Sequence, residues 1–496
     1  MPQGETPAQL SPNLPLVFAT GDAGTDLVMN GGIPSQATTL IIGPPGAGKT
    51  VLALQIGFAA AQTGRNVVYL TNISESHIRM LQHARNFSFF NESLIRQNFN
   101  LISINSSVQQ QGIDATLNFI MDVARSAKAD ILIIDSYLGL KQLFQSEGPQ
   151  GRNLMFTLSS RLSMLAVTTI LLGEYRYDDI HIEPEFAVAD AIVELSYSIY
   201  GLMRSRYLSV IKMRGKAFLE GLHRLTISDK GITVFPRQES LPLHLTDAVS
   251  TERVSLGIPQ LDTMLSGGVF AGSTSLVAGG AGIGKTLLGL HFLMAGAPDE
   301  VGLMVSFQES EAQLRQRLAE LTMGPHLAKH IEILHLSSIE LILDQAAWMI
   351  RQKVVHQNIR RIVIDTIDSF EQSSQYQQRI NDFIRSLITM LSEHHVTAIL
   401  IYEMPFMQGQ YSFANINQRY STDTIIFMHH VEINSRLQRS ITVVKQRGSN
   451  HDQSLRQMDI IDGNITIGAP FSNLSHILTG LPIVTSIDSE KESARE

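Results

Sequence analysis

Cysteine is absent from the 496-residue chain, and this absence excludes disulfide bonds, zinc–thiolate sites and thiol catalysis. A chain without disulfides suits a reducing compartment. Charged residues make up only 17 % of the sequence, and the formal net charge is -8. This negative balance disfavours attraction of the whole protein to nucleic acid or to an anionic membrane surface.

Long apolar runs are also missing from the sequence. The apolar stretches, such as the one from Leu165 to Leu172, are too short to span a bilayer. Residues 1–15 are polar and rich in proline, and they lack the basic and apolar regions of a signal peptide. We therefore expect a cytoplasmic protein that does not associate with membranes.

A glycine-rich octapeptide, GPPGAGKT, occupies residues 43–50. An apolar, β-branched run precedes it over residues 38–42, and a run of apolar helix formers follows it. In this strand–loop–helix context the glycines let backbone N–H groups turn towards phosphate oxygens at a helix N-terminus. A tight turn without a ligand is the plainer interpretation, but it does not account for the flanking strand and helix. The candidate ATP-binding residues are Gly43, Gly46, Gly48, Lys49 and Thr50.

The same motif recurs as GGAGIGKT at residues 279–286. In both copies the lysine is expected to reach the β- and γ-phosphates of ATP, and the threonine hydroxyl is expected to hold Mg²⁺. The candidate binding residues of the second copy are Gly279, Gly282, Gly284, Lys285 and Thr286.

Both motifs match the phosphate-binding loop, or P-loop, of nucleotide-binding proteins. Each P-loop is followed later in the chain by an apolar strand that ends in an aspartate, Asp135 in the first half and Asp365 in the second. A carboxylate at the carboxyl end of a buried parallel strand lies where doubly wound sheets bind ligands. These are the Walker B positions, and they complete the predicted Mg²⁺ ligands, which are Thr50, Asp135, Thr286 and Asp365. The lysines lie 236 residues apart and the aspartates 230 apart. Such matched spacing predicts two tandem α/β ATP-binding domains.

Four stretches of the second half carry a resemblance to a known family. They are RVSLG at 253–257, SFQES at 306–310, STDTII at 421–426 and VVKQRG at 443–448. Together with the double-domain length, they resemble the KaiC-like proteins of the RecA superfamily of ATPases over roughly residues 18–480.

The resemblance implies two tandem RecA-like P-loop NTPase domains of the α/β class, with mainly parallel sheets flanked by helices. We expect the first KaiC-like ATP-binding domain at residues 17–240 and the second at 241–481. Residues 1–16 are expected to be a disordered N-terminus, and residues 482–496 a flexible charged tail.

The family also forms two-tiered homohexamers with ATP between subunits. The resemblance therefore implies that Lys212, Arg214, Lys445 and Arg447 contact the γ-phosphate held by a neighbouring subunit. A cation supplied in trans makes assembly depend on ATP and stabilises charge during phosphoryl transfer. The plainer interpretation is a solvated basic strand end, but the K-x-R-G pattern recurs in both halves.

The sequence departs from the family at the pair of adjacent glutamates whose first member acts as general base. The corresponding residues are Ser74-Glu75 and Gln308-Glu309, so the first glutamate is absent from both halves. Loss of a general base costs about 10²–10⁴-fold in rate. Glu75 and Glu309 remain candidate catalytic residues, although adjacent side chains of an extended chain point to opposite faces. Gln308 is a candidate for orienting a water. We therefore expect strong ATP binding and slow hydrolysis.

A second departure concerns autophosphorylation. Counting back from Asp423, the positions of the family's phosphorylated Ser-Thr pair hold Arg419 and Tyr420. Tyr420, Ser421 and Thr422 are the remaining candidate acceptors.

These residues indicate three candidate functions. The first is a nucleotide-regulated homohexamer in signalling, with an unknown regulatory protein partner. The second is an autophosphorylating Ser/Thr kinase of clock type. The third is a DNA-handling RecA-like ATPase, which the acidic charge balance disfavours. A scaffold in which the nucleotide is purely structural would differ from the first only in showing no difference between its ATP and ADP states.

Overall fold

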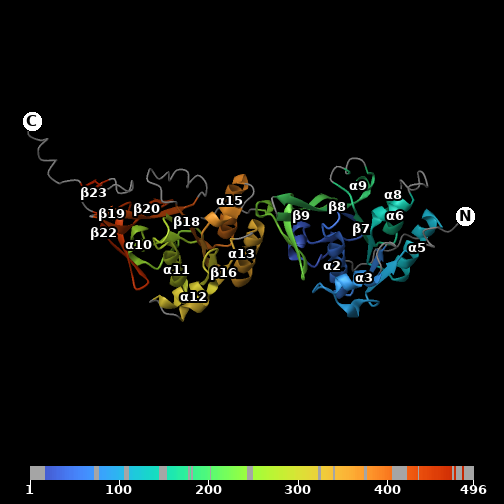
Figure 1. The fold of residues 1–496 in the computed structure, drawn as a ribbon, viewed down its shortest axis with the longest axis horizontal. Helices are drawn as coiled ribbons and strands as arrows, with labels where there is room; N and C mark the ends of the chain where they lie inside the picture. The colour runs from blue at the N-terminus through green and yellow to red at the C-terminus, as the bar shows by residue number, and fades with distance from the viewer. Residues whose placement is uncertain are drawn as a thin grey trace, which may run out of the picture. The chain divides into compact units, whose positions relative to one another are not determined.

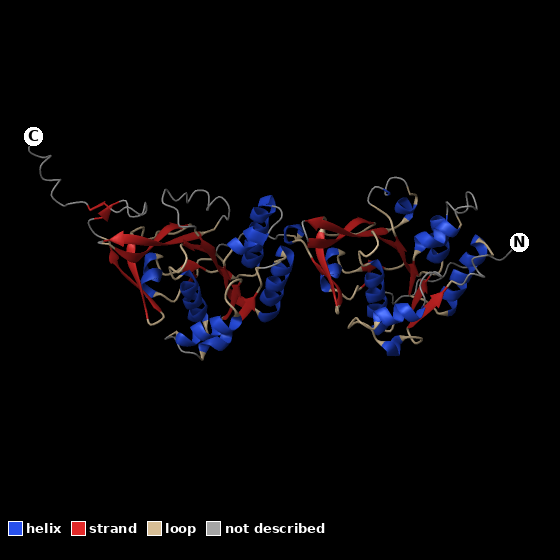
Figure 2. Cartoon of the chain, in the orientation of Figure 1, coloured by secondary structure: helices blue, strands red, loops and turns tan. Residues whose placement is uncertain are grey.

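The computed structural model describes residues 17–71, 77–104, 111–144, 154–176, 179, 183–200, 203–242, 250–321, 326–338, 341–373, 377–404, 422–433, 435–471, 474–475 and 483–484. The chain divides into two compact units, Met1–Leu241 and Pro242–Glu496, and Figure 1 labels their elements. Figure 2 shows that both units contain helices and strands, as the sequence predicts for α/β domains. Among the described residues, no helix is both long enough and apolar enough to cross a membrane.

The elements of the first unit, in chain order, are β1 (Val17–Phe18), α1 (Ala23–Val28), β2 (Ile33–Pro34), β3 (Thr38–Ile42), α2 (Lys49–Gln62), β4 (Val67–Thr71), α3 (His77–Ala84), the 3₁₀ turn η1 (Glu92–Leu94), β5 (Phe99–Ser103), α5 (Ile113–Ser126), β6 (Ile131–Asp135), α6 (Tyr137–Leu143), α8 (Leu154–Ser163), β7 (Thr168–Gly173), α9 (Glu185–Val188), β8 (Ala191–Tyr200), β9 (Met203–Met213), β10 (His223–Ser228), β11 (Gly231–Phe235) and η4 (Gln238–Ser240).

The elements of the second unit are β12 (Arg253–Val254), α10 (Pro259–Met264), β13 (Val269–Phe270), β14 (Thr274–Gly279), α11 (Lys285–Gly296), β15 (Val301–Ser306), α12 (Glu311–Glu320), η5 (Leu327–His330), β16 (Ile331–His335), α13 (Leu343–Gln357), β17 (Ile359–Asp365), α14 (Asp368–Ser373), α15 (Gln377–Glu393), β18 (Thr397–Glu403), β19 (Thr424–Ile433), β20 (Arg436–Gln446), β21 (Arg456–Ile461), β22 (Asn464–Pro470), β23 (Leu474–Ser475) and β24 (Ile483–Val484).

Each unit is built around one nine-stranded sheet, and the two sheets have the same strand order. The first runs β11-β10-β9-β8-β3-β7-β6-β4-β5, and the second runs β22-β21-β20-β19-β14-β18-β17-β15-β16. Six strands of each sheet are parallel, from β8 to β5 and from β19 to β16. The other three pair antiparallel beyond them. The predicted fold of two mainly parallel α/β domains is therefore confirmed.

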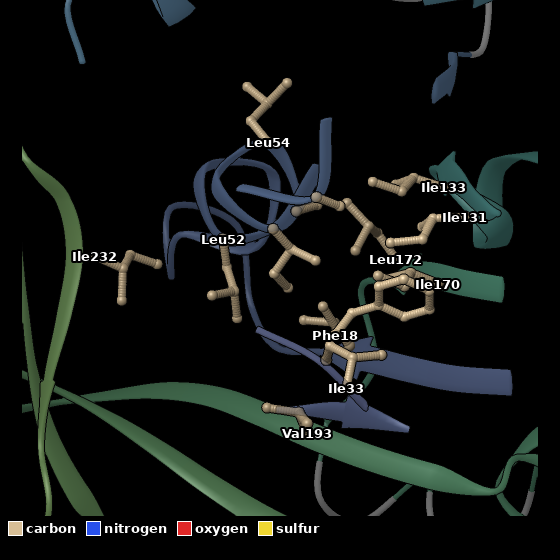
Figure 3. Close-up of a cluster of buried hydrophobic side chains, with 14 of the residues drawn as sticks. Phe18, Ile33, Leu52, Leu54, Ile131, Ile133, Ile170, Leu172, Val193 and Ile232 are labelled. Atoms are coloured by element: carbon tan, nitrogen blue, oxygen red, sulfur yellow. The ribbon is translucent and has the colours of Figure 1, made fainter. Parts of the chain in front are cut away.

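Side chains of the parallel strands alternate between two apolar clusters, because successive residues of a strand point to opposite faces. In β6, Ile131 and Ile133 join the cluster that packs on α2, and Figure 3 shows this cluster around Leu52. Leu132 and Ile134 join the cluster on the other face, with residues of α5 and α8. Burial on both faces explains why these strands are apolar at every position.

The second unit repeats this arrangement around β17. Val363 packs in the cluster that includes residues of α11, and its neighbours Ile362 and Ile364 pack with residues of α13 and α15. The loop after β3 and the loop after β14 therefore both emerge at the carboxyl edge of a parallel sheet. Each of these central strands lies between two parallel neighbours, and open α/β sheets bind ligands at the carboxyl ends of their strands.

Candidate functional site

The two P-loops join a central strand to a helix in the same way. The glycine that precedes each helix has a left-handed backbone, with φ of 113° at Gly48 and 114° at Gly284. Only glycine adopts this conformation without a steric cost, so it lets the chain turn directly into α2 or α11. The free N–H groups of the first helical turn then face the carboxyl edge of the sheet, where they can bind phosphate.

The first glycine of each loop is required by a close approach of the neighbouring strand. A Cβ atom at Gly43 would lie 2.0 Å from the carbonyl oxygen of Leu195 on β8. A Cβ at Gly279 would lie 2.3 Å from the carbonyl oxygen of Met428 on β19. By contrast, a Cβ at Gly46 or at Gly282 would meet no heavy atom within 4 Å. Each loop therefore packs closely against one strand at its first glycine and has open space at Gly46 or Gly282, where a phosphate could fit.

Each P-loop lysine folds back over its own loop. Lys49 Nζ donates to the carbonyl oxygens of Gly43, at 2.8 Å, and Pro44, at 3.1 Å. Lys285 Nζ donates to the same positions of the second loop, Gly279 at 2.9 Å and Gly280 at 2.7 Å. Burial lowers the pKa of both amines, and nearby carboxylates oppose this shift. The lysines are thus held where the loop would wrap the β- and γ-phosphates.

The predicted Mg²⁺ ligands lie in contact in both units. Thr50 Oγ1 donates to Asp135 Oδ2 at 2.9 Å, and Thr286 Oγ1 donates to Asp365 Oδ2 at 2.6 Å. Asp135 is two residues beyond Ile133, so it points to the face covered by α2 and reaches its first turn. Burial raises the pKa of both aspartates, and the hydrogen bonds they accept oppose this effect. A hydroxyl and a buried carboxylate are oxygen donors of the kind that bind Mg²⁺ together with substrate phosphates.

The second unit has a cavity of about 640 Å³ beside its P-loop. Its lining includes Lys285, Thr286 and Asp365 together with Gln308 and Glu309, which the sequence predicts as catalytic candidates, and Glu403 at the end of β18. It also includes Arg317 and Glu320 of α12, Leu321 directly after that helix, and Ile460 and Gly463 from the β21–β22 hairpin. Residues from six segments of the chain therefore meet around one volume, which is in the size range of ligand pockets.

Gln308 and Glu309 have different environments in this cavity. Gln308 is exposed to solvent. Glu309 Oε2 forms an ion pair with Arg317 Nε at 3.1 Å, and its backbone is fixed by two hydrogen bonds to the Ser306 hydroxyl. The uncharged side chain is therefore the freer of the two, and the carboxylate is held by a cation from α12.

The corresponding pair of the first unit, Ser74 and Glu75, lies outside the described residues. In sequence, the two pairs differ in how many residues separate them from the end of the preceding strand. Thr71 pairs with Asp135, and Ser306 pairs with Asp365. Gln308 thus follows the end of its strand by two residues, whereas Ser74 follows by three.

The glutamates that follow the neighbouring strands differ in exposure. Glu403 ends β18 half-buried, acts electrostatically on Lys285, and donates its backbone N–H to Asp368 Oδ2 at 2.8 Å. Burial is the main cause that raises the pKa of Asp368 to about 6. Glu174, after β7, is exposed and acts on Lys49. Both glutamates therefore lie close enough to the P-loop lysines to influence their charge.

The K-x-R-G residues lie at the opposite edge of each sheet from the P-loops. The N–H of Arg214 donates to the carbonyl of Asp190, whose own N–H donates to Thr38, the first residue of β3. The N–H of Arg447 bonds in the same way to Asp423, and Asp423 to Thr274 at the start of β14. Five residues of strand, about 16 Å, separate Thr38 from Gly43 at the P-loop. The structure therefore does not bring these cations to the P-loop of their own domain.

A model of the ATPase family described as "ATPase: KaiC" matches residues 18–239 and 254–471, which is nearly the whole of both units. The chain belongs to the KaiC family of ATPases.

Similar curated KaiC proteins match along almost their full length. The circadian clock oscillator protein KaiC of Picosynechococcus sp. is 29% identical over 488 residues, covering 95% of this chain and 93% of the relative. The circadian clock oscillator protein KaiC 1 of Synechocystis sp. is 28% identical, with the same coverage. The KaiC of Synechococcus elongatus is 27% identical, again over 95% and 93%. The tandem KaiC domains are thus common to this chain and these relatives.

Two contacts of the KaiC-type sites were not apparent from the sequence. Tyr69, which reads as a core residue of β4, donates its hydroxyl to Asp135 Oδ2 at 2.8 Å. Tyr69 and Asp135 point to the same face of the sheet, and their strands β4 and β6 are neighbours. This contact could be predicted only if the strand order were known. Arg317 lies on a polar helix and carries no local signal, because its partner Glu309 belongs to the preceding loop.

Proposed function

We propose that this KaiC-family protein is a cytoplasmic, ATP-binding regulator that forms a nucleotide-dependent homohexamer and hydrolyses ATP slowly. The observation that carries this proposal is the separation of each K-x-R-G motif from the P-loop of its own domain. If these cations act on a nucleotide, that nucleotide belongs to another subunit.

Nucleotide binding is supported by the residues around each P-loop. The open glycines at Gly46 and Gly282 leave space for phosphate oxygens, and Lys49 and Lys285 already lie across the loops. A Mg²⁺ ion bound with the nucleotide would supply positive charge to its phosphates. The Thr–Asp pairs would hold that ion, since a hydroxyl oxygen and a carboxylate oxygen lie in contact in both units.

Contact in trans would make assembly depend on the nucleotide. Arg214 and Arg447 are both exposed, so they are accessible to a neighbouring subunit. Charge-assisted hydrogen bonds from arginine to phosphate are strong and directional. A subunit that offers Arg214 and Arg447 at one edge and ATP at the other binds its neighbour head to tail, which closes a ring if the rotation allows.

Slow hydrolysis is supported by the residues at the end of β15. Gln308 cannot accept a proton as a carboxylate does, and Glu309 is engaged by Arg317. The site therefore has what is needed to hold ATP but has no free carboxylate at the position of the family's general base. We expect turnover to be lower than a positioned base would give, by about 10²–10⁴-fold.

A signalling role rests on the relatives, which are named circadian clock oscillator proteins. Autophosphorylation receives less support. The side chain of Thr422 is 1% exposed, and its carbonyl accepts a hydrogen bond from Lys445 Nζ at 2.6 Å. Tyr420 and Ser421 lie outside the described residues. DNA handling receives no support from the described residues, and the net charge of -8 disfavours binding to nucleic acid.

The test is size-exclusion chromatography with light scattering, in the absence of nucleotide and with ADP or a non-hydrolysable ATP analogue, with bound nucleotide counted per chain. We expect a hexamer with the analogue, carrying about two nucleotides per chain because the chain has two P-loops. Lys49→Ala and Lys285→Ala should each remove one of them. The double variant Arg214→Ala/Arg447→Ala should not assemble, whereas Arg125→Ala, at an exposed surface ion pair, should behave as wild type. A wild-type protein that stays monomeric in all three conditions would refute the hexamer.

A further inference from the structure

The first unit contains a buried ion cluster that the ATP site does not use directly. Lys141 Nζ lies 2.6 Å from Glu183 Oε2 and 2.7 Å from Glu185 Oε1. The side chain of Lys141 is 8% exposed and that of Glu185 is fully buried, while Glu183 is one third exposed. Charges are rarely buried to this extent unless they are paired, so the three side chains hold their two segments together.

The cluster fixes α9 onto α6. Tyr137 and Lys141 are four residues apart on α6, so they lie on the same face of the helix. The hydroxyl of Tyr137 donates to Glu185 Oε1 at 3.4 Å, the same oxygen that Lys141 approaches. Burial lowers the pKa of Lys141, but its hydrogen bonds to Glu183 and Glu185 outweigh this effect and raise it. The lysine is therefore a stable cation between the two elements.

The short helix α9 also holds both cations of the first K-x-R-G motif. Lys212 Nζ donates to the carbonyl oxygens of Phe186 and Ala187, each at 3.0 Å. Arg214 Nη2 donates to the carbonyl of Ala187 at 2.8 Å, and its Nη1 donates to Asp190 Oδ1 at 3.2 Å. The carbonyls that orient Lys212 and Arg214 thus belong to the two residues directly after Glu185.

A continuous set of contacts therefore joins the nucleotide site to these cations. Asp135 ends β6, and α6 begins two residues later, with Ser136 capping it through the N–H of Gly139 at 3.1 Å. Lys141 of α6 binds Glu185 of α9, and α9 in turn binds Lys212 and Arg214. The position of α9, and with it that of the two cations, depends on Lys141.

The second unit has no equivalent cluster among its described residues. Lys141 is six residues after Asp135, and the residue six after Asp365 is Glu371, which has the opposite charge. Lys445 instead donates to the carbonyl of Thr422, directly before β19. The residues of the second unit that correspond to α9 lie outside the described residues.

We propose that Lys141, through Glu183 and Glu185, is a positioning residue that fixes Lys212 and Arg214 for contact with the nucleotide of a neighbouring subunit. This inference rests on the proposed role of these two cations in assembly. It assigns to Lys141 an effect on assembly and turnover without any contact with the nucleotide of its own domain.

The test compares the concentration of a non-hydrolysable ATP analogue at which the full chain assembles, by light scattering, in wild type and variants. Lys141→Met is expected to raise this midpoint about tenfold, since small misplacements of positioned groups have effects of this size or larger. Binding of a fluorescent ATP analogue to the monomer, at protein concentrations below assembly, should stay unchanged. Lys141→Arg, which keeps the charge, should restore most of the loss, and Arg125→Ala should match wild type.

Two further variants make the result decisive. Arg214→Ala reports on the proposed function: normal assembly of this variant would refute the role of the cation in trans. If Arg214→Ala fails to assemble while Lys141→Met assembles as wild type, the positioning role is wrong and the role in trans stands. Glu183→Gln leaves the pair of Lys141 with Glu185 and should shift the midpoint in the same direction by a smaller factor. It decides the question if Lys141→Met does not fold, and an unchanged midpoint in Glu183→Gln would then overturn the inference.

Discussion

Gln308 and Glu309 stand side by side after β15, and only Glu309 carries a charge. Arg317 of α12 pairs with that charge, so the Glu309 carboxylate is already engaged in an ion pair. Gln308 is exposed and lines the same cavity as Lys285 and Asp365. A single change at Gln308 therefore tests whether a missing base limits turnover.

We expect Gln308→Glu to raise ATP turnover by about 10²-fold, the lower end of what a positioned general base contributes. The measurement is phosphate release in a Lys49→Ala background, in which only the second domain binds ATP. The matched control adds Lys285→Ala, which should abolish the gain. An unchanged turnover in Gln308→Glu would mean that the rate is limited elsewhere.

Asp368 is a half-buried carboxyl group whose ionisation costs stability. Its pKa rises from 3.8 to about 6 in the folded protein, first because of burial and further because of the nearby Glu371. The folded state therefore holds the proton more tightly than the unfolded chain does. The cost is absent below about pH 4, grows as the pH rises, and is complete above about pH 6.

We expect Asp368→Asn to stabilise the second domain at pH 7.5 by about 1–2 kcal/mol, a value reduced for the partial exposure of the carboxyl group. The gain should vanish towards pH 4, where Asp368 is protonated in both states. Urea unfolding followed by the fluorescence of Trp348, the single tryptophan, reports on this domain. The exposed Asp459→Asn should have no effect, and a gain that is independent of pH would contradict the assignment.

At the scale of elements, the P-loops are shaped by the strands beside them. β19 presses its Met428 carbonyl against Gly279, whereas Gly280 has open space around the Cβ position and no positive φ. The two adjacent glycines therefore differ in what a methyl group would cost. Only Gly279 must lack a side chain for β14 to pack against β19.

We expect Gly279→Ala to destabilise the second domain by about 1–3 kcal/mol, as other overpacked core sites do. Gly280→Ala should be neutral or stabilising by about 0.4–1 kcal/mol, because alanine restricts the unfolded chain more than glycine does. The fluorescence of Trp348 during urea unfolding again provides the measurement. Equal effects of the two substitutions would show that the close approach of Met428 does not decide the outcome.

At the scale of the whole molecule, the two domains share one fold but differ in some of the side chains around their sites. Both sheets have the same strand order, and both place the P-loop and the K-x-R-G motif at opposite edges. The duplication explains why assembly is expected to involve both domains. The residue six positions after each Walker B aspartate differs in charge: it is Lys141 in the first domain, where it pairs with Glu185 of α9, and Glu371 in the second.

The repeat, the α/β class and the residues of both P-loops could be predicted from the sequence. The reason is physical: these features depend on contiguous segments, namely an apolar strand, a glycine-rich turn and a helix start. The roles of the predicted residues in catalysis and in contact between subunits remain predictions. The assignment of Ser74 and Glu75, which lie outside the described residues, also remains a prediction.

Only the tertiary structure decided which distant side chains meet. The ion pair of Glu309 with Arg317 and the hydrogen bond of Tyr69 to Asp135 depend on how helices and strands are packed. The contact of Lys141 with Glu185 joins residues 44 positions apart, on two helices whose pairing no local pattern reveals. The sequence by itself therefore determined where the two P-loops lie, because each is built from one contiguous segment. The groups that hold the carboxylates and cations around it were decided by the packing of separate elements.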